Sequence, residues 1–130
     1  MIDMHSHIIN GIDDGSKSIE MTINMLKKAE QSGTTDIIAT PHFMRGRFEV
    51  EYNEVLKKVE ELKEISRENN IDINIYAGQE VYYSRKLLEY YNDKIIGTIN
   101  NSKYMLIELP MLEFNIEEVI NTIYELQIRG

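Results

Sequence analysis

Strand-like and helical patterns alternate four times along the chain, and this alternation limits the fold more than any other feature of the sequence. Short runs rich in branched apolar residues predict strands, and longer segments with apolar residues at helical spacing predict helices. The predicted strands cover residues 1–7, 35–40, 71–77 and 103–109, and the predicted helices cover about residues 18–32, 51–68, 84–91 and 115–129. Such alternation favours a parallel sheet with right-handed crossovers. We therefore expect an α/β fold of four strand–helix units, in one domain spanning residues 1–130.

The ends of the predicted helices carry capping signals. Either Ser16 or Ser18 can cap the first helix. Asn115 can cap the last helix, with Glu118 placed to complete a capping box, and Gly130 lies where a glycine commonly follows a helix. Residues 94–102 are irregular in pattern, and a small hairpin is one candidate there. The residues expected on the inner face of the last helix are Ile116, Val119, Ile120, Ile123 and Leu126.

All three histidines of the chain fall at the carboxyl ends of predicted strands. His5 and His7 end the first strand, and His42 follows the second. Carboxylates hold the equivalent positions of the last two strands, at Glu80 and Glu108. Because the carboxyl ends of parallel strands meet at one edge of a sheet, we expect these side chains to converge on a shared pocket.

The N-terminal segment holds the densest group of potential metal ligands. On a regular strand His5 and His7 project from one face, and two neighbouring imidazoles can hold one metal ion. Asp13-Asp14-Gly15 follows and adds hard oxygen donors at a turn. Asp13 is the weaker ligand candidate of the two, because it can serve as a turn or capping residue. The structural alternatives are histidines bonded to backbone, an ordinary Asp-Asp-Gly turn, and carboxylates held in salt bridges.

Composition removes several classes of function. Without cysteine the chain has no disulfide, no thiolate zinc site and no cysteine nucleophile, which fits a cytoplasmic protein. A net charge of −8 argues against nucleic acid as a partner. No apolar run approaches the length needed to insert into a membrane. The one basic cluster, Arg45-Gly46-Arg47, either contacts a phosphate group of a substrate or is a solvated loop pair.

Five motifs together resemble the PHP (polymerase and histidinol phosphatase) superfamily, in order and in spacing over residues 1–130. The resemblance is closest to the capsule-associated branch, the manganese-dependent protein tyrosine phosphatases of bacterial exopolysaccharide operons. It implies a distorted (β/α)7 barrel, which is TIM-like, with a cluster of up to three metal ions. The motifs are His5-Ser6-His7, Asp13-Asp14-Gly15, Thr40-Pro41-His42, Gly78-Gln79-Glu80 and Leu106-Ile107-Glu108.

The resemblance also implies which residues bind which ion. Manganese is the metal of the branch that the chain resembles, and a mixed set of histidines and carboxylates also suits iron or zinc. Bound cations would clamp phosphate oxygens and activate a water for attack on phosphorus, chemistry that needs no cysteine. The implied ligand sets are His5, His7 and Glu80 for one ion, Glu80 and Glu108 for a second, and Asp14 and His42 for a third.

The chain departs from the family that it resembles in one respect. Family members are longer, and their second half supplies a further histidine, an Asp-x-His pair and phosphate-binding arginines. No histidine follows His42 in this chain. We therefore interpret the chain as the N-terminal half of such a protein and expect its activity to be impaired.

Three functions follow from the resemblance. The leading hypothesis is a metal-dependent protein tyrosine phosphatase that acts on the tyrosine-rich tail of a bacterial tyrosine kinase in capsule or exopolysaccharide regulation. The second is a phosphatase of small molecules, of the kind that acts on histidinol phosphate. The third is a remnant that binds metal or a partner without catalysis. In each case, open barrel edges predict self-association.

Overall fold

The computed structural model describes residues 1–110 and 115–129 as an α/β fold in which all the strand pairs are parallel. Two three-stranded sheets carry the fold, in the orders β1-β2-β4 and β3-β5-β6. The predicted parallel sheet is therefore confirmed in type, but six short strands in two sheets replace the four strands expected. The elements in chain order are β1 (Ile2–Ser6), α1 (Ile19–Gln31), β2 (Asp36–Ala39), β3 (His42–Phe43), α2 (Tyr52–Glu68), β4 (Asn74–Ala77), β5 (Glu80–Tyr82), α3 (Leu87–Asn92), a 3-10 turn (Ile99–Asn101), β6 (Leu106–Glu108) and α4 (Ile116–Arg129).

Two of the expected strands, β2 and β4, end within their predicted ranges, and each is followed by a short further strand that belongs to the second sheet. β2 passes into β3 at Pro41, which lacks a backbone N–H to donate to a sheet. β4 passes into β5 through Gly78, whose N–H donates to the carbonyl of Ala39 (2.9 Å). Past the break, the N–H of Glu80 donates to the carbonyl of Pro41 (2.9 Å), so backbone pairing spans both sheets.

A bulge near the end of β1 changes the direction of its last side chains. Asp3 pairs with Ile37 and Ser6 with Ala39, so β1 contains one residue more than β2 over this interval. The Asp3 carboxylate accepts a hydrogen bond from the backbone N–H of His5 (3.1 Å) inside the bulge. Bulges re-aim side chains beside functional sites, and this one lies where the first two histidines leave the strand.

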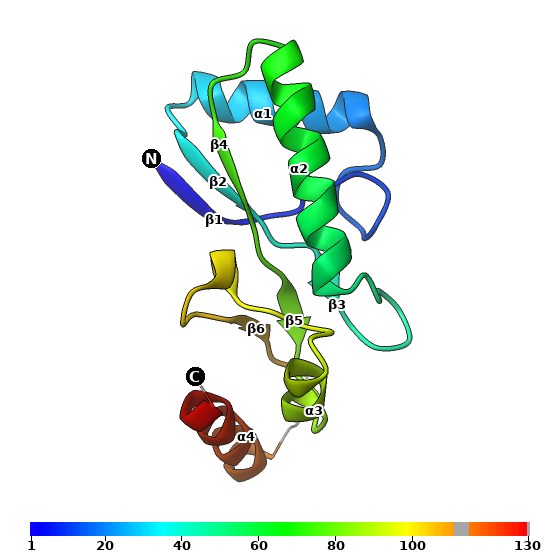
Figure 1. Cartoon of the computed structure of the whole chain (residues 1–130), viewed down its shortest axis with the longest axis vertical. Coiled ribbons are helices and arrows are strands. Elements are labelled where there is room, and N and C mark those ends of the chain that lie inside the picture. The colour runs from blue at the N-terminus through cyan, green and yellow to red at the C-terminus, as the bar shows by residue number, and fades with distance from the viewer. Residues whose placement is uncertain (111–114, 130) are drawn as a thin grey trace.

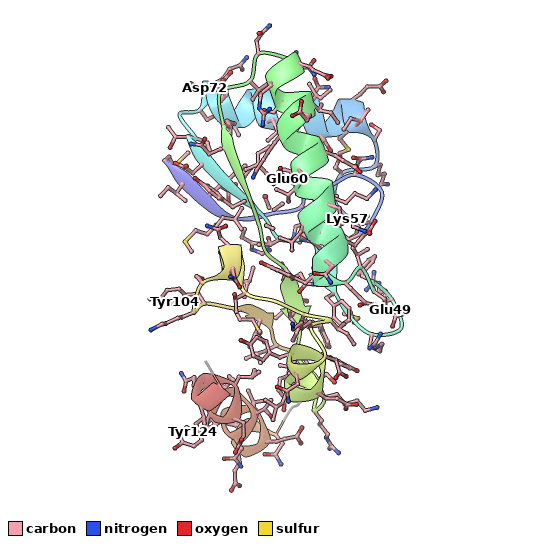
Figure 2. All side chains as sticks on the ribbon, in the orientation of Figure 1. Glu49, Lys57, Glu60, Asp72, Tyr104 and Tyr124 are labelled. Atoms are coloured by element: carbon pink, nitrogen blue, oxygen red, sulfur yellow. The ribbon has the colours of Figure 1, made fainter. Side chains whose placement is uncertain are left out.

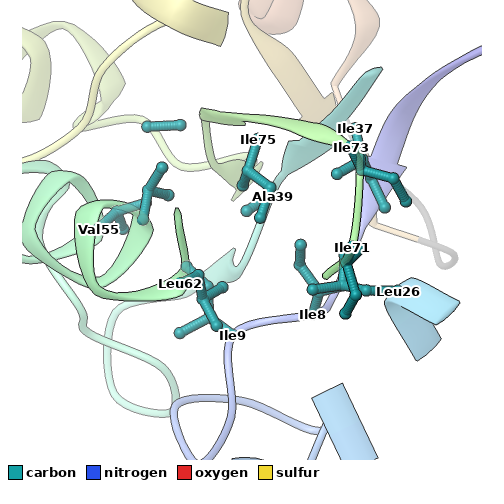
Figure 3. Close-up of a cluster of buried hydrophobic side chains, with 12 residues drawn as sticks. Ile8, Ile9, Leu26, Ile37, Ala39, Val55, Leu62, Ile71, Ile73 and Ile75 are labelled. Carbon is teal, nitrogen blue, oxygen red and sulfur yellow. The ribbon is translucent and has the colours of Figure 1, made fainter. Parts of the chain in front are cut away.

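Helices α1 and α2 pack against the β1-β2-β4 sheet and bury the larger of two apolar clusters (Figures 1 and 3). Ser18 caps α1, and its hydroxyl accepts a hydrogen bond from the N–H of Met21 (3.1 Å). Of the two predicted caps, Ser16 and Ser18, the structure therefore selects Ser18. Leu26 and Val55 are 0% exposed and place the two helices against the sheet. The buried residues of this cluster are Ile8, Ile9, Leu26, Ile37, Ala39, Val55, Val59, Leu62, Ile71, Ile73, Ile75 and Ala77.

Helices α3 and α4 lie at the other end of the molecule, beside the β3-β5-β6 sheet (Figure 1). Val119 of α4 is buried there, and Ile123 and Leu126 pack against the same cluster. The prediction for Ile116 and Ile120 is wrong, because their side chains are 64% and 59% exposed. The buried residues of this second cluster are Phe43, Val81, Tyr83, Leu87, Tyr90, Ile96 and Val119.

The remaining predicted features have mixed outcomes. Asn115 caps α4 as predicted, with its side-chain oxygen accepting from the N–H of Glu118 (3.1 Å). The Glu118 carboxylate instead accepts from Tyr83 and Arg85. The suggested hairpin at residues 94–102 is wrong, since a 3-10 turn occupies its end. Gly130 lies outside the described residues. None of the helices in residues 1–110 and 115–129 is long and apolar enough to cross a membrane.

Candidate metal centre

The bulged end of β1 points two imidazoles at the first residue of β5. Nε2 of His5 and Nε2 of His7 lie 3.1 Å apart. Nε2 of His7 lies 3.3 Å from Oε2 of Glu80, and Nε2 of His5 contacts the same oxygen. Glu80 is only 5% exposed, so three donor atoms converge on a point that is closed on the protein side.

A third imidazole, from the first residue of β3, joins this group to the next strand and to the N-terminal turn. Nε2 of His42 lies 2.9 Å from Oε1 of Glu80 and 3.3 Å from Oε2 of Glu108. Its Nδ1 lies 3.0 Å from Oδ1 of Asp14. The ring stacks on that of His7, with centroids 4.4 Å apart.

The six side chains predicted as ligands thus lie in one continuous cluster at the junction of the two sheets. Sets of three donors within 4.8 Å of one another are formed by His5, His7 and Glu80, by His42, Glu80 and Glu108, and by His7, Asp13 and His42. The breaks at Pro41 and Gly78 place His42 and Glu80 at the carboxyl ends of β2 and β4, as expected for a parallel fold. The ligand role of the six residues stays a prediction.

The charges of the cluster favour a cation between its carboxylates. The neighbouring carboxylate of Glu80 raises the pKa of Glu108 above its ordinary value. Burial works to raise the pKa of Glu80 as well, but the hydrogen bond from Glu108 and the nearby histidines lower it. Two adjacent carboxyl groups are a suitable pair for a divalent ion, whose positive charge would offset their mutual repulsion.

A buried nitrogen of His42 supports the same conclusion. Nδ1 of His42 is buried and makes no hydrogen bond in the described part of the chain, although Oδ1 of Asp14 lies 3.0 Å away. Buried polar atoms without a hydrogen-bond partner are rare in folded proteins, and they often mark a bound ion or water. A metal ion shared with Asp14, whose side chain is 56% exposed, would satisfy this atom.

Asp13 makes the turn contact predicted for it, accepting from the N–H of Gly15 (2.9 Å), and it also contacts two of the histidines, which the sequence analysis did not predict. Its carboxylate is 0% exposed and accepts hydrogen bonds from Nδ1 of His7 (3.0 Å) and from the backbone N–H of His42 (2.9 Å). Burial alone would raise the pKa of Asp13, but these bonds and a third from Gly15 lower it to about 2. The bond to Asp13 in turn raises the pKa of His7. The doubled Asp-Asp was the available signal, but it does not say which carboxylate turns inward.

The turn after the histidines needs glycine at residue 15. A Cβ atom built on Gly15 would lie 2.3 Å from Cβ of His7 and 2.5 Å from its carbonyl oxygen. Neither atom can move without moving the end of β1. The N–H of Ser16 also donates to that carbonyl (3.0 Å), so the Asp-Asp-Gly turn folds directly back over His7.

The two arginines predicted to contact substrate have different surroundings. Arg45 pairs with Glu49 (3.1 Å) and lies over the ring of Tyr90, 4.7 Å from its centroid. Arg47 lies over the ring of Phe48 (4.9 Å), and that ring stacks on His42 with centroids 5.6 Å apart. Arg47 is therefore one aromatic ring away from the cluster, whereas Arg45 is tied to α3.

The chain is similar over its whole length to proteins of one known family. The family model described as "Capsular polysaccharide synthesis, CpsB/CapC" matches residues 1–130, the full length of the chain. The chain belongs to the CpsB/CapC family. CapC of Staphylococcus aureus is 40% identical over 131 residues, which are 100% of this chain and 51% of that protein. The tyrosine-protein phosphatase CpsB of Streptococcus pneumoniae is 38% identical over 85% of this chain and 46% of its own length.

A solved CpsB/CapC structure shares the fold. It comes from a study of YwqE from Bacillus subtilis and CpsB from Streptococcus pneumoniae, described as unique metal-dependent tyrosine phosphatases. It superposes with a TM-score of 0.92 at 29% identity, over 100% of this chain and 52% of the solved one. The chain spans about half the length of the relatives that it matches.

Proposed function

We propose that this chain carries part of the active site of a metal-dependent protein tyrosine phosphatase. One observation supports the proposal above all others: three histidines and several carboxylates from separate strands meet within hydrogen-bond distance of each other. The names of the relatives agree, since CpsB and YwqE are called tyrosine-protein phosphatases. Histidines and carboxylates together suit manganese, which we propose as the metal, with iron and zinc as alternatives.

We assign a separate set of side chains to each proposed cation. Up to three divalent ions, when bound, would neutralise phosphate charge and activate water for attack on phosphorus. Phe48 packs on the ring of His42, and the buried Glu80 would offer one oxygen to the ion held with His5 and His7 and the other toward His42. The proposed sets are His5, His7 and Glu80 for one ion, Glu80 and Glu108 for a second, and Asp14 and His42 for a third.

We propose that residues 1–130 form one domain built as part of a distorted (β/α)7 barrel. The TM-score of 0.92 over the whole chain supports this assignment. The continuous pairing of β2 with β4 and of β3 with β5 gives the strand order that such a barrel needs. A cytoplasmic location agrees with the absence of cysteine from the sequence.

The proposed substrate is a phosphotyrosine protein, namely the tyrosine-rich tail of a bacterial tyrosine kinase in capsule regulation. The match to a capsular polysaccharide synthesis family supports this biological setting. The experiment compares a phosphotyrosine peptide with histidinol phosphate in the presence of Mn²⁺. We expect slow hydrolysis of the peptide that is lost on chelation, since the 130 residues cover half of the relatives. A preference for histidinol phosphate would favour the small-molecule phosphatase instead.

A matched pair of variants separates catalysis from simple metal binding. Glu108→Gln should lower the hydrolysis rate at least about 100-fold, because losing a cation ligand removes transition-state stabilisation. Glu60→Gln changes an exposed carboxylate of α2 and should leave the rate unchanged (Figure 2). Binding of Mn²⁺ without any turnover would contradict the phosphatase and support the non-catalytic remnant.

Arg47 is the better candidate for a contact with substrate than Arg45. The guanidinium of Arg45 is already satisfied by Glu49 and by the ring of Tyr90. The guanidinium of Arg47 makes no ion pair within residues 1–110 and 115–129, and it lies beside Phe48 at the cluster. We expect Arg47→Ala to raise KM for the phosphopeptide, and Arg45→Ala to lower stability with KM unchanged.

We also propose that the chain self-associates, through its open barrel edges or through the exposed face of α4. An outer stripe on α4, formed by Ile116, Ile120, Tyr124 and Ile128, is about 60% exposed at each position. Tyr124 points away from the rest of the protein (Figure 2). An apolar stripe of this length in water favours association with a second apolar surface.

A further inference from the structure

One buried carboxylate holds three segments of the candidate metal centre in place. Oδ2 of Asp13 accepts hydrogen bonds from Nδ1–H of His7 (3.0 Å) and from the backbone N–H of His42 (2.9 Å). Oδ1 accepts one from the backbone N–H of Gly15 (2.9 Å). The side chain is 0% exposed, so the protein rather than solvent satisfies this charge. Both carboxylate oxygens of Asp13 are therefore occupied by protein donors.

The contact with Asp13 decides which nitrogen of His7 carries a proton. An ionised carboxylate only accepts hydrogen bonds, so the proton between the two groups belongs to Nδ1 of His7. A neutral imidazole protonated at Nδ1 has its lone pair on Nε2. That Nε2 lies 3.1 Å from Nε2 of His5 and 3.3 Å from Oε2 of Glu80. The lone pair of His7 consequently points into the donor cluster.

We propose that Asp13 is a positioning residue that fixes the Nδ1–H tautomer and the ring direction of His7, and thereby prepares Nε2 to bind a metal ion. The inference depends on metal binding by His7, which is part of the proposed function, but not on the reaction that follows. Partners of this kind change metal affinity by about 10–100-fold. Because the same carboxylate also holds the backbone of His42, Asp13 sets the position of two imidazoles from two strands.

Direct ligation by Asp13 is the competing assignment. His7, Asp13 and His42 bring donor atoms within 4.8 Å of one another, as a small metal site would. However, Oδ2 already accepts two hydrogen bonds and Oδ1 a third. Asp14 is the neighbour that faces outward, with a 56% exposed side chain. The two adjacent carboxylates thus have different roles. Asp13 orients the imidazole of His7 by a hydrogen bond, and Asp14 is the candidate metal ligand.

The test compares Asp13→Asn with Asp36→Asn in the full chain. Asp36 is a matched control, since its carboxylate likewise accepts three hydrogen bonds, here from the side chains of Thr35, Asn74 and Tyr76, at the end of β2 far from the cluster. Long-range nitrogen–proton NMR spectra of the metal-free protein, at a pH where the histidines are neutral, report the tautomer of His7. Calorimetry with Mn²⁺ reports affinity.

The expected results separate positioning from general destabilisation. His7 of the unsubstituted protein and of Asp36→Asn should carry its proton on Nδ1, and Asp13→Asn should lose this preference. The affinity for Mn²⁺ should fall about 10–100-fold in Asp13→Asn and stay within about 2-fold in Asp36→Asn.

Two results would overturn the proposal. One is a proton on Nε2 of His7 in the unsubstituted protein, which needs no variant to fold. The other is unchanged affinity and tautomer in Asp13→Asn. A lack of phosphatase turnover alongside the expected tautomer and affinity would contradict the proposed function and leave the role of Asp13 intact.

Discussion

The two sheets of this protein differ in how completely they are covered. The β1-β2-β4 sheet lies under two long helices and buries twelve residues in one cluster. The β3-β5-β6 sheet buries seven, beside a six-residue helix and an α4 that leaves its outer stripe exposed. A cavity of about 530 Å³ separates β6 from α4, lined mainly by Tyr91, Met105, Ile107, Ile123 and Leu126.

This difference matters because the candidate metal centre draws on both regions. His5, His7 and Asp13 come from the well-covered first sheet and its loop, whereas Glu80 and Glu108 belong to strands of the second. Burial of apolar surface is the main source of folding free energy. We infer that the first region supplies most of the stability of the chain and that the second depends on it for correct placement of its carboxylates.

The largest expected effect on stability tests how much the buried packing of α2 contributes in the first region. Leu62→Ala removes a side chain that is 2% exposed in the first cluster, and we expect it to lower the free energy of unfolding by about 3 kcal/mol. Leu56→Ala removes the same atoms from the same helix at a position 42% exposed, and should cost less than about 1 kcal/mol. Urea titrations measure both. Equal losses would show that the packing of α2 contributes little.

A second prediction concerns the border between the regions. Glu80→Gln should weaken Mn²⁺ binding at least about 100-fold, since Glu80 contacts histidines from both sheets and a direct ligand matters at least as much as its supporting partners. Glu60→Gln, on the exposed face of α2, provides the control and should bind as the unsubstituted chain does. Calorimetry measures the Mn²⁺ affinity of each variant. Unchanged affinity in Glu80→Gln would contradict the proposal that Glu80 is a metal ligand.

The third prediction is a pH dependence that belongs to the first region. Asp13 has a pKa of about 2, below its ordinary value of 3.8. The ionised Asp13 carboxylate stabilises the folded state above pH 3.8. This stabilisation, about 2 kcal/mol in the free energy of unfolding, is lost as the pH falls toward 2. The pKa of His7 is raised, so the benefit of its positive charge is present below pH 6.5 and declines above the raised value.

Acid unfolding in the presence of a chelator checks this dependence. Asp13→Asn should flatten the stability profile between about pH 4 and pH 2 relative to the unsubstituted chain. A profile of Asp13→Asn parallel to that of the unsubstituted protein would contradict the assignment of this titration to Asp13.

The smallest expected effect on folding tests the exposed side of the second region. Ile120→Ser, at a position 59% exposed, should change stability by less than about 0.5 kcal/mol yet reduce self-association in sedimentation. Asn121→Ser, also exposed on α4, should alter neither property. Association that persists in Ile120→Ser would exclude the outer stripe as the contact surface.

The sequence predicted the parts of this structure that depend on local pattern. The alternation of strands and helices, the cap at Ser18 and the cap at Asn115 depend on residues close together in the chain. The gathering of His5, His42 and Glu80 followed from one general rule about the carboxyl ends of parallel strands. The rule about carboxyl ends applies here even though β2 is followed by a separate strand β3 and β4 by a separate strand β5.

The features that were wrong or missed depend on contacts between distant segments. The bulge in β1 shows only in its register with β2. Helix α4 has two neighbouring apolar faces, and only packing against the second cluster selects Val119 over Ile120. Asp13 and Asp14 are identical in kind and adjacent, so burial against His7 alone separates them.

The carboxylate of Glu80 turns its two oxygens toward different neighbours, Oε2 toward His5 and His7 and Oε1 toward His42. A planar group of this kind cannot adjust one oxygen without displacing the other. If ions bind on both sides as proposed, occupancy on one side would alter affinity on the other, and by thermodynamic reciprocity the influence would run equally in both directions. Titration with a divalent metal should accordingly deviate from independent, equivalent sites.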